Sequence, residues 1–327
     1  MASIDLQRLE LFADNAQTIK KEFIWQHAMI KRLAALLYTA QNKAIDIPAI
    51  QECYALIKKN TGLFSTFRGN TAMTIATLLS LSENPDERFS DTLKAYEVMK
   101  QQRFGACDYL VIAAYQIAAN ASRDEYAEKI RRMRAFYDSM KDMHRFLTGQ
   151  DDYIFSAMLA LSDIDIRDGV RNMERCFEIL RPEFHSGMGV QALTQVLVLG
   201  GSDTGIETRV LDLRNALKNR GLKLNHAYTL SSLGVLALLP LDTGDIADQI
   251  ERTSELLRCK QGFGIWSVTK QELLLLSVGL VSLSTVDQVN ILNTALSTSI
   301  TNIIIAQQAA IIAASAAASA SAAAASS

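Results

Sequence analysis

The sequence has very little proline and no clear strand pattern. Four prolines occur among 327 residues, and segments that alternate polar and apolar residues are hard to find. Leucine, alanine, glutamate, lysine and glutamine are abundant, and these residues suit helices. Because a strand with one exposed face alternates polar and apolar residues, the composition argues against a β-rich fold and predicts helix throughout.

Cysteine pairs, an excess of one charge and a leader segment are also missing. The four cysteines lie far apart with no CxxC pair, which is typical of reduced thiols and predicts a cytoplasmic protein. Basic and acidic residues number 33 and 35, so the basic excess of a nucleic-acid-binding protein is absent. The first residues, MASIDLQRLELF, carry acids and no continuous apolar run, so we expect no secretory signal.

One apolar phrase recurs along the chain and predicts a repeat of about 40 residues. Its copies are separated by 42, 36, 44, 38, 39 and 40 residues when anchored at Thr39, Leu81, Ile117, Leu161, Leu199, Leu238 and Val278. A second helix in each unit carries one apolar stripe, as at Tyr126, Ile130, Met133, Tyr137 and Met140. The first helix is apolar on most faces and should be buried between its neighbours.

We therefore predict an all-α fold of about seven tandem helical hairpins, forming a curved α/α superhelix or a closed α/α toroid. Residues 1–299 would form a single helical-repeat domain, although the length alone suggests about two domains. Residues 300–327 are rich in alanine and serine and carry no charge, which predicts a C-terminal helix or tail. Gln307, Gln308 and many serines argue against a stable membrane span there.

Several helix starts carry capping signals. Ser122 and Glu125 have the spacing of a capping box. Asn84 precedes Pro85, and Asp46 stands just before Ile47 and Pro48, so each is placed as an N-cap ahead of a proline in the first turn. These signals set expected starts for three of the amphipathic helices.

The junctions between units combine glycine with an aromatic residue, as in NTGLFSTFRGN at residues 60–70 and QGFGIW at 261–266. Glycine suits a helix C-cap, and the aromatic side chain should fix the loop to the stack, so a structural turn is the simplest interpretation. Loops at one end of stacked helices also line binding grooves. Our candidate binding residues come from these loops: Phe67, Arg68, Asn70, Asp151, Asp152 and Trp266.

A basic residue ends the second helix in six units. These residues are Lys58, Lys100, Lys141, Arg181, Lys218 and Arg258. Compensation of the helix dipole explains this pattern by itself. The alternative is a basic rim that meets an acidic partner or a phosphate.

The sequence contains no recognisable catalytic, metal or cofactor motif. His144, His185 and His226 are spaced 41 residues apart, but they are not equivalent positions of the repeat, and no HExxH or HxxxH spacing supports zinc. Adjacent Asp151 and Asp152 suit a helix start better than a divalent ion site. We therefore expect no catalytic residue, metal or cofactor, and whether the chain is an enzyme stays open.

The stretches KKNTGLFSTFRGN, FLTGQDDYIFSAMLALS and KQGFGIW, with the alanine-rich end, resemble an uncharacterised bacterial family of helical proteins, best represented in Firmicutes. The resemblance covers nearly the whole chain and implies an all-helical fold, but it implies no activity. A second likeness is to the α/α-toroids of terpene cyclases and protein prenyltransferases, whose DxDD signature and zinc ligands have no counterpart here.

Three functional hypotheses follow, the third of them being membrane association through residues 300–327. The first is a non-catalytic helical-repeat scaffold that binds a protein or peptide partner in its concave face, with no nucleic acid involved. The second is a small-molecule-binding protein or enzyme with its site at the loop end of an α/α toroid, using Arg68, Asp151 and Asp152. Convergence of these three residues in one cavity would favour the second hypothesis. The oligomeric state is not indicated.

Overall fold

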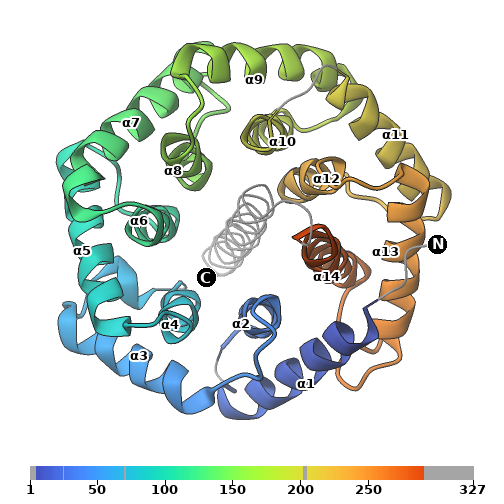
Figure 1. Cartoon of the computed structure of the whole chain (residues 1–327), viewed down its shortest axis with the longest axis horizontal. Helices are drawn as coiled ribbons and strands as arrows, with labels where there is room; N and C mark the ends of the chain where they lie inside the picture. Colours follow the sequence, from blue (N-terminus) through green and yellow to red (C-terminus); the bar gives the residue numbers. More distant parts are fainter. Residues whose placement is uncertain (1–4, 25, 70, 202–204, 291–327) are drawn as a thin grey trace, which may run out of the picture. The chain divides into compact units, whose positions relative to one another are not determined.

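The computed structural model describes residues 5–24, 26–69, 71–201 and 205–290, and every regular element in this part of the chain is helical. The α-helices, labelled in Figure 1, are α1 Leu6–Glu22, α2 Ala28–Ala40, α3 Ile47–Asn60, α4 Ala72–Ser80, α5 Pro85–Gln101, α6 Asp108–Asn120, α7 Tyr126–Met143, α8 Tyr153–Leu161, α9 Ile166–Leu180, α10 Gly187–Leu199, α11 Ile206–Asn219, α12 Leu230–Ala237, α13 Thr243–Arg258 and α14 Lys270–Asn290. The all-α prediction is confirmed.

The helix starts follow from the capping residues. The Asp46 carboxylate accepts a hydrogen bond from the Ala49 amide at 3.0 Å and begins α3. Asn84 caps α5 with Pro85 in its first turn. The Ser122 amide donates to the Glu125 carboxylate at 2.9 Å, in a capping box at the short 3₁₀ turn that leads into α7. All three predicted starts are confirmed.

Even-numbered and odd-numbered helices differ in burial. Even-numbered helices are buried around most of their circumference, and in α6 every residue from Leu110 to Ala118 is buried. Odd-numbered helices bury one stripe. In α7 the predicted stripe from Tyr126 to Met140 is buried, whereas polar residues cover its other face. Apolar periodicity therefore placed both kinds of helix in their layers.

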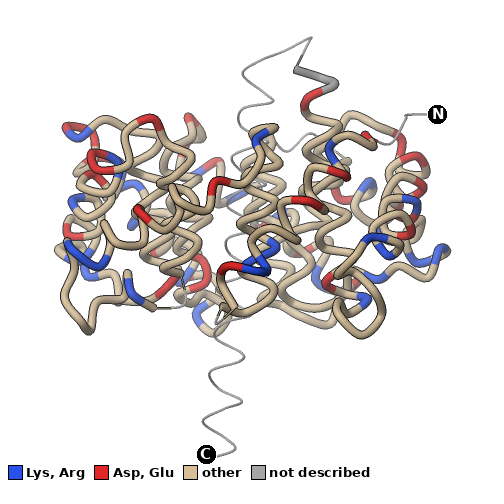
Figure 2. The backbone as a smooth tube through the Cα atoms, turned by 90° about the horizontal axis from the view of Figure 1, so that it is seen from below, with Lys and Arg blue, Asp and Glu red and all other residues tan. Residues whose placement is uncertain are grey.

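Several helical hairpins form across the glycine-aromatic junctions. α1 packs extensively on α2, α3 on α4, α5 on α6, α7 on α8 and α13 on α14, so in these five pairs the odd-numbered helix packs on the even-numbered helix that follows it. Successive even-numbered helices also pack together, as α6 does with α8 and α10 with α12. Figure 2 shows acidic and basic residues interspersed along the described helices rather than gathered in blocks of one sign.

The described helices fall into two compact units. Unit 1 contains the described parts of residues 1–45 and 172–307, and unit 2 contains those of residues 46–171. α9 spans the boundary between them. The predictions of one repeat domain over residues 1–299, of about seven repeats, and of a superhelix or toroid stay predictions. Residues 300–327 lie outside the described part of the chain.

Within unit 1 the first helices of the chain pack on the last described ones (Figure 1). α1 contacts α13 and α14, and α2 contacts α14. Arg32 of α2 pairs with Glu272 of α14 at 2.5 Å and donates to the Ser267 carbonyl at 2.9 Å. Arg8 of α1 pairs with Asp287 of α14. Segments that are far apart in sequence are therefore joined by charge pairs as well as by apolar packing.

Two arginines hold the ends of buried helices in the same way, one in each unit. Arg132 of α7 donates to the carbonyls 28, 30 and 32 residues ahead, those of Ala160, Ser162 and Ile164. Arg209 of α11 donates at the same three offsets, to the carbonyls of Ala237, Leu239 and Leu241. The last carbonyls of a helix have no donor within it, so each guanidinium completes the end of the next buried helix.

Candidate functional site

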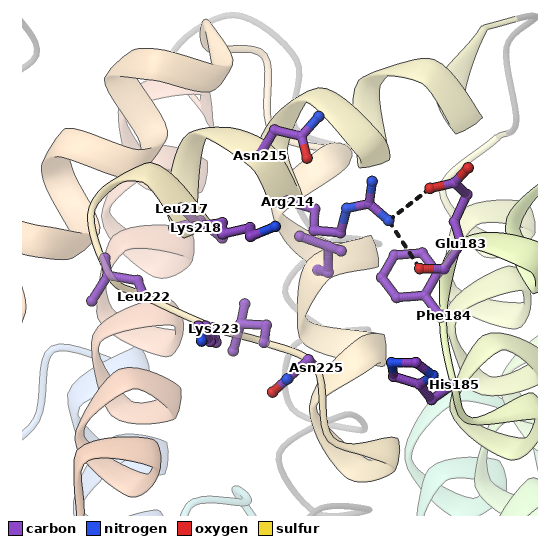
Figure 3. A pocket seen from close by; sticks show the side chains of 12 residues that line it. Glu183, Phe184, His185, Arg214, Asn215, Leu217, Lys218, Leu222, Lys223 and Asn225 are labelled. Atoms are coloured by element: carbon purple, nitrogen blue, oxygen red, sulfur yellow. Dashed lines mark hydrogen bonds and ion pairs between the residues drawn. The ribbon is translucent and has the colours of Figure 1, made fainter.

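A cavity of about 300 Å³ opens in unit 1 between two successive junctions (Figure 3). We call it the Arg214 pocket. One wall comes from the α9–α10 junction and the other from the last turns of α11 and the α11–α12 junction, with Leu233 of α12 behind them. Its lining residues are Glu183, Phe184, His185, Arg214, Asn215, Leu217, Lys218, Leu222, Lys223, Leu224, Asn225 and Leu233.

The floor of the Arg214 pocket is apolar because the α11–α12 junction alternates its side chains. Gly221 has φ of +69°, a left-handed conformation that ends α11 and turns the chain into an extended segment. Side chains in extended backbone point alternately to opposite sides. Leu222 and Leu224 are buried, whereas Lys223 and Asn225 are exposed. The sequence GLKLN thus supplies both the floor and part of the rim.

The rim of the Arg214 pocket is predominantly basic. The Arg214 guanidinium donates to the Glu183 carboxylate at 3.0 Å and to the Glu183 carbonyl at 2.9 Å, and it lies 5.2 Å from the centroid of the Phe184 ring. In Figure 3 the Phe184 ring lies below this ion pair. Lys218 and Lys223 are exposed, and within the described residues neither ammonium group makes a hydrogen bond or ion pair. The lining therefore contains three cationic side chains and one carboxylate.

This arrangement suits binding of an anion beside an apolar group. An anionic oxygen placed between Lys218 and Lys223 would gain two cationic donors without breaking the Arg214–Glu183 pair. The leucine floor and the Phe184 ring would accept the apolar part of the same ligand. The lining residues include no serine, cysteine or threonine.

The candidate residues from the first junction have structural roles. Phe67 is buried, and its ring centroid lies 5.0 Å from that of Tyr96 and 5.7 Å from that of Phe89. Arg68 donates to the Lys58 and Thr61 carbonyls and, at 3.1 Å, to the Thr61 hydroxyl. It therefore completes the C-terminal end of α3. Asn70 lies outside the described residues.

The two adjacent aspartates of the α7–α8 junction differ in environment. Asp152 is buried and accepts a hydrogen bond from the Gly149 amide at 2.9 Å, in the short 3₁₀ turn Gln150–Asp152 that leads into α8. Asp151 is half-buried, and burial raises the pKa of its carboxyl above the ordinary value of 3.8. The negative charge of Asp151 also adds to burial in raising the pKa of the Tyr109 hydroxyl.

The structure does not gather the predicted candidates in the Arg214 pocket. Arg68, Asp151 and Asp152 belong to unit 2, whereas this pocket belongs to unit 1. Trp266 belongs to unit 1 but projects fully into solvent from the α13–α14 junction, with a relative exposure of 101%. Sequence reasoning therefore missed the pocket, although Lys218 was one of the six basic residues that marked a possible rim.

The two arginines among those six basic residues donate hydrogen bonds to the junctions that follow their own helices. Arg181 donates to the Phe184 carbonyl at 2.8 Å. Arg258 donates to the Phe263 carbonyl at 3.0 Å and to the Val268 carbonyl at 2.9 Å. Each of these arginines therefore places a favourable positive charge at the end of its helix and also contacts the loop directly.

One buried thiol in unit 1 makes an unusual polar contact. Cys176 of α9 donates to the Glu207 carboxylate of α11 at 3.1 Å, and Arg175 pairs with the same carboxylate at 3.1 Å. Burial raises the pKa of Cys176 to about 12, so the thiol is protonated at neutral pH and unreactive. Burial alone would raise the pKa of Glu207, but these two contacts outweigh it and lower the pKa.

Within the described ranges, no cluster of three or more histidine, cysteine, aspartate or glutamate side chains is placed to hold a metal ion. In the same part of the chain, no helix combines the length and apolar character needed to span a bilayer.

Helices packed in adjacent pairs, with a basic pocket between two junctions of unit 1, define an all-helical protein. The chain belongs to the family described as "Protein of unknown function (DUF4003)", whose family model matches residues 15–309. The resemblance drawn from the sequence to an uncharacterised bacterial helical family is thereby confirmed.

A curated relative is similar to part of the chain. The protein named "Uncharacterized protein YeaA" from Bacillus subtilis (strain 168) is 22% identical over 187 residues. This match covers 55% of the chain and 56% of the relative, so it spans little more than half of either protein. No solved structure matches the chain.

Proposed function

We propose that this chain is a non-catalytic, cytoplasmic helical scaffold that binds a protein or peptide partner through an acidic group seated in the Arg214 pocket. The observation that supports the proposal is the surplus of cationic side chains around an apolar floor. Arg214 is paired with Glu183, whereas Lys218 and Lys223 project from the rim. The partner would present a carboxylate next to an apolar side chain.

The proposal predicts modest contributions from each lysine. Charges at an exposed rim are screened by water, so each lysine should contribute about 0.4–1 kcal/mol to binding of an acidic group. This corresponds to a two- to fivefold change in affinity for each side chain, about tenfold for both. Specificity would come from the apolar floor, because a ligand without an apolar group would leave it solvated.

A second candidate function is binding of a small anionic molecule in the same pocket. A volume of about 300 Å³ lies at the lower limit of small-molecule sites. This candidate keeps the ligand class of the second sequence hypothesis but uses residues other than Arg68, Asp151 and Asp152. Native mass spectrometry of protein purified gently from its host separates the two. A bound small mass that is lost in the Lys218→Met/Lys223→Met double variant would support this candidate.

The scaffold proposal is tested by fluorescence anisotropy with two labelled dodecapeptides, one alternating leucine with glutamate and one alternating leucine with glutamine. We expect the acidic peptide to bind and the glutamine peptide to bind about tenfold more weakly, with the double variant reducing the difference to near zero. The matched control is Lys100→Met, which removes the basic residue at the corresponding end of α5. Equal binding of both peptides, or an unaltered affinity in the double variant, would refute the proposal.

A further inference from the structure

Two turns of the chain are built alike and expose apolar side chains that turns seldom carry. Residues 62–65 read GLFS and residues 264–267 read GIWS. In each, the serine amide donates to the glycine carbonyl, at 3.0 Å for Ser65 and 2.9 Å for Ser267. We call these turns the GLFS tip, in unit 2, and the GIWS tip, in unit 1.

The two central residues of each tip are almost completely solvent-exposed. Leu63 and Phe64 have relative exposures of 80% and 102%, and Ile265 and Trp266 have 80% and 101%. The central positions of turns usually hold glycine, proline, asparagine or aspartate. Contiguous exposed apolar side chains of this size mark a surface that meets another apolar phase.

Neither tip is a loosely held loop. Beside the GIWS tip, Phe263 is buried against Phe12, and Arg258 and Arg32 donate to the carbonyls of Phe263, Val268 and Ser267. Beside the GLFS tip, Phe67 is buried and Arg68 donates to the end of α3. The backbone on either side of each apolar pair is therefore held in place by packing and hydrogen bonds, so binding would cost little backbone conformational entropy.

The charge around both tips has one sign in the sequence. No aspartate or glutamate occurs between Glu52 and Glu83, where Lys58, Lys59 and Arg68 flank the GLFS tip. None occurs between Glu255 and Glu272, where Arg258, Lys260 and Lys270 flank the GIWS tip. Lys58, Lys59 and Lys270 are exposed. Lys260 pairs with Glu10, whereas Lys58, Lys59 and Lys270 make no ion pair within the described residues. An apolar pair flanked in the sequence by unpaired lysines is complementary to an anionic, apolar-cored partner.

We infer that each tip inserts its apolar pair into the interfacial region of an anionic lipid bilayer. The side chains sit at the apex of a turn, so a protein partner would need a fitted pocket for each of two separate tips. A bilayer needs no such fit, because the headgroup region deforms around any small apolar wedge. Tryptophan and lysine both favour this region, the lysines through anionic headgroups. This inference is independent of the Arg214 pocket.

Trp266 provides a direct probe of insertion. The chain contains two tryptophans, Trp25 and Trp266, so a Trp25→Phe variant reports on the GIWS tip alone. With vesicles of equal parts phosphatidylcholine and phosphatidylglycerol, its emission should shift to the blue and be quenched by lipids brominated on their acyl chains. With pure phosphatidylcholine vesicles the shift should be much smaller, and raised salt should reduce it.

Vesicle co-sedimentation of the full chain tests both tips. We expect Ile265→Ser/Trp266→Ser and Leu63→Ser/Phe64→Ser each to lower partitioning, and the two combined in one chain to lower it at least about tenfold, since together they remove all four inserting side chains. The control is Ile179→Ser, which changes an apolar residue of α9 that is 47% exposed, next to Glu178. It should partition like the unaltered chain.

Three results would overturn the inference. The first is no emission shift with anionic vesicles, and the second is unchanged partitioning of both tip variants. The third is concentration-dependent self-association, measured by sedimentation without lipid, that the tip substitutions abolish. That outcome would assign the tips to contacts between copies of the chain instead.

Discussion

Arg209 offers the sharpest test of how the buried helices are held. Its guanidinium donates to three carbonyls at the end of α12, at 2.7, 2.6 and 2.5 Å. Arg209→Met keeps most of the stem and removes all three donors. Charge-assisted hydrogen bonds contribute about 1.5–3 kcal/mol each when dry, but water reaches this half-buried side chain, so we take about 1 kcal/mol for each. The expected loss is about 3 kcal/mol.

Arg209→Lys separates charge from geometry. A lysine ammonium keeps the positive charge but lacks the planar fork that reaches three carbonyls at once. It should retain about one of the three bonds, so we expect a loss of about 2 kcal/mol. Arg132→Met should cost the same as Arg209→Met, since Arg132 contacts carbonyls at the same three offsets.

The matched control is Arg171→Met. Arg171 is exposed and pairs with Asp168 one turn away at 2.6 Å, so its loss should cost under about 0.5 kcal/mol. Because a chain of this size need not unfold in one step, local stability is measured by hydrogen exchange of peptides covering α12 or α8, alongside urea unfolding. If Arg209→Met costs no more than Arg171→Met, water satisfies these carbonyls and the arginine does not stabilise the helix end.

Two further predictions concern a close contact and a buried acid. A Cβ at Gly189 would lie 2.8 Å from a backbone carbonyl of the α11–α12 junction, so Gly189→Ala should lower the free energy of unfolding by about 1–3 kcal/mol. The control is Gly62→Ala, because a Cβ at Gly62 would meet nothing within 4 Å. An equal loss in both variants would contradict this reasoning. Burial raises the pKa of Asp151, so stability should fall as pH rises from 3.8 through the folded-state pKa. Asp151→Asn should then exceed the unaltered chain in urea stability at pH 7 and match it below pH 3.8, whereas a less stable variant at pH 7 would show that the carboxylate makes a favourable contact.

Which helices are buried and which are amphipathic could be predicted from the sequence, because both properties depend on residues close together in the chain. An apolar stripe at helical spacing in α7 specifies one buried face, and capping residues such as Asp46 and Asn84 specify where helices start. Which helices pack against each other was harder to predict from the sequence. The sequence suggested hairpins of a buried helix followed by an amphipathic one, whereas amphipathic helices such as α3, α5, α7 and α13 pack most extensively on the buried helix that follows them. Such contacts depend on how long loops fold back, which spacing does not encode.

The candidate residues show the same division. Residue type made Arg68 and Asp152 attractive, yet their hydrogen bonds go to the backbone of their own junctions. By contrast, nothing in the sequence distinguishes the segments that form the Arg214 pocket from other loops. RPEFHS and GLKLN carry no motif, and they become a site because two junctions 40 or so residues apart lie against the end of α11.

The sequence by itself determined the all-helical class, the two kinds of helix, several helix starts and the family, because propensity, capping and apolar periodicity act within a few residues. Only the tertiary structure decided which loop side chains are buried by packing and which remain exposed to solvent. Phe67 and Phe263 are buried, whereas Phe64 and Trp266, of the same chemical kind and a few residues away, are exposed. The physical reason is that burial at a junction depends on the neighbouring hairpin, and its position is a property of the packed chain.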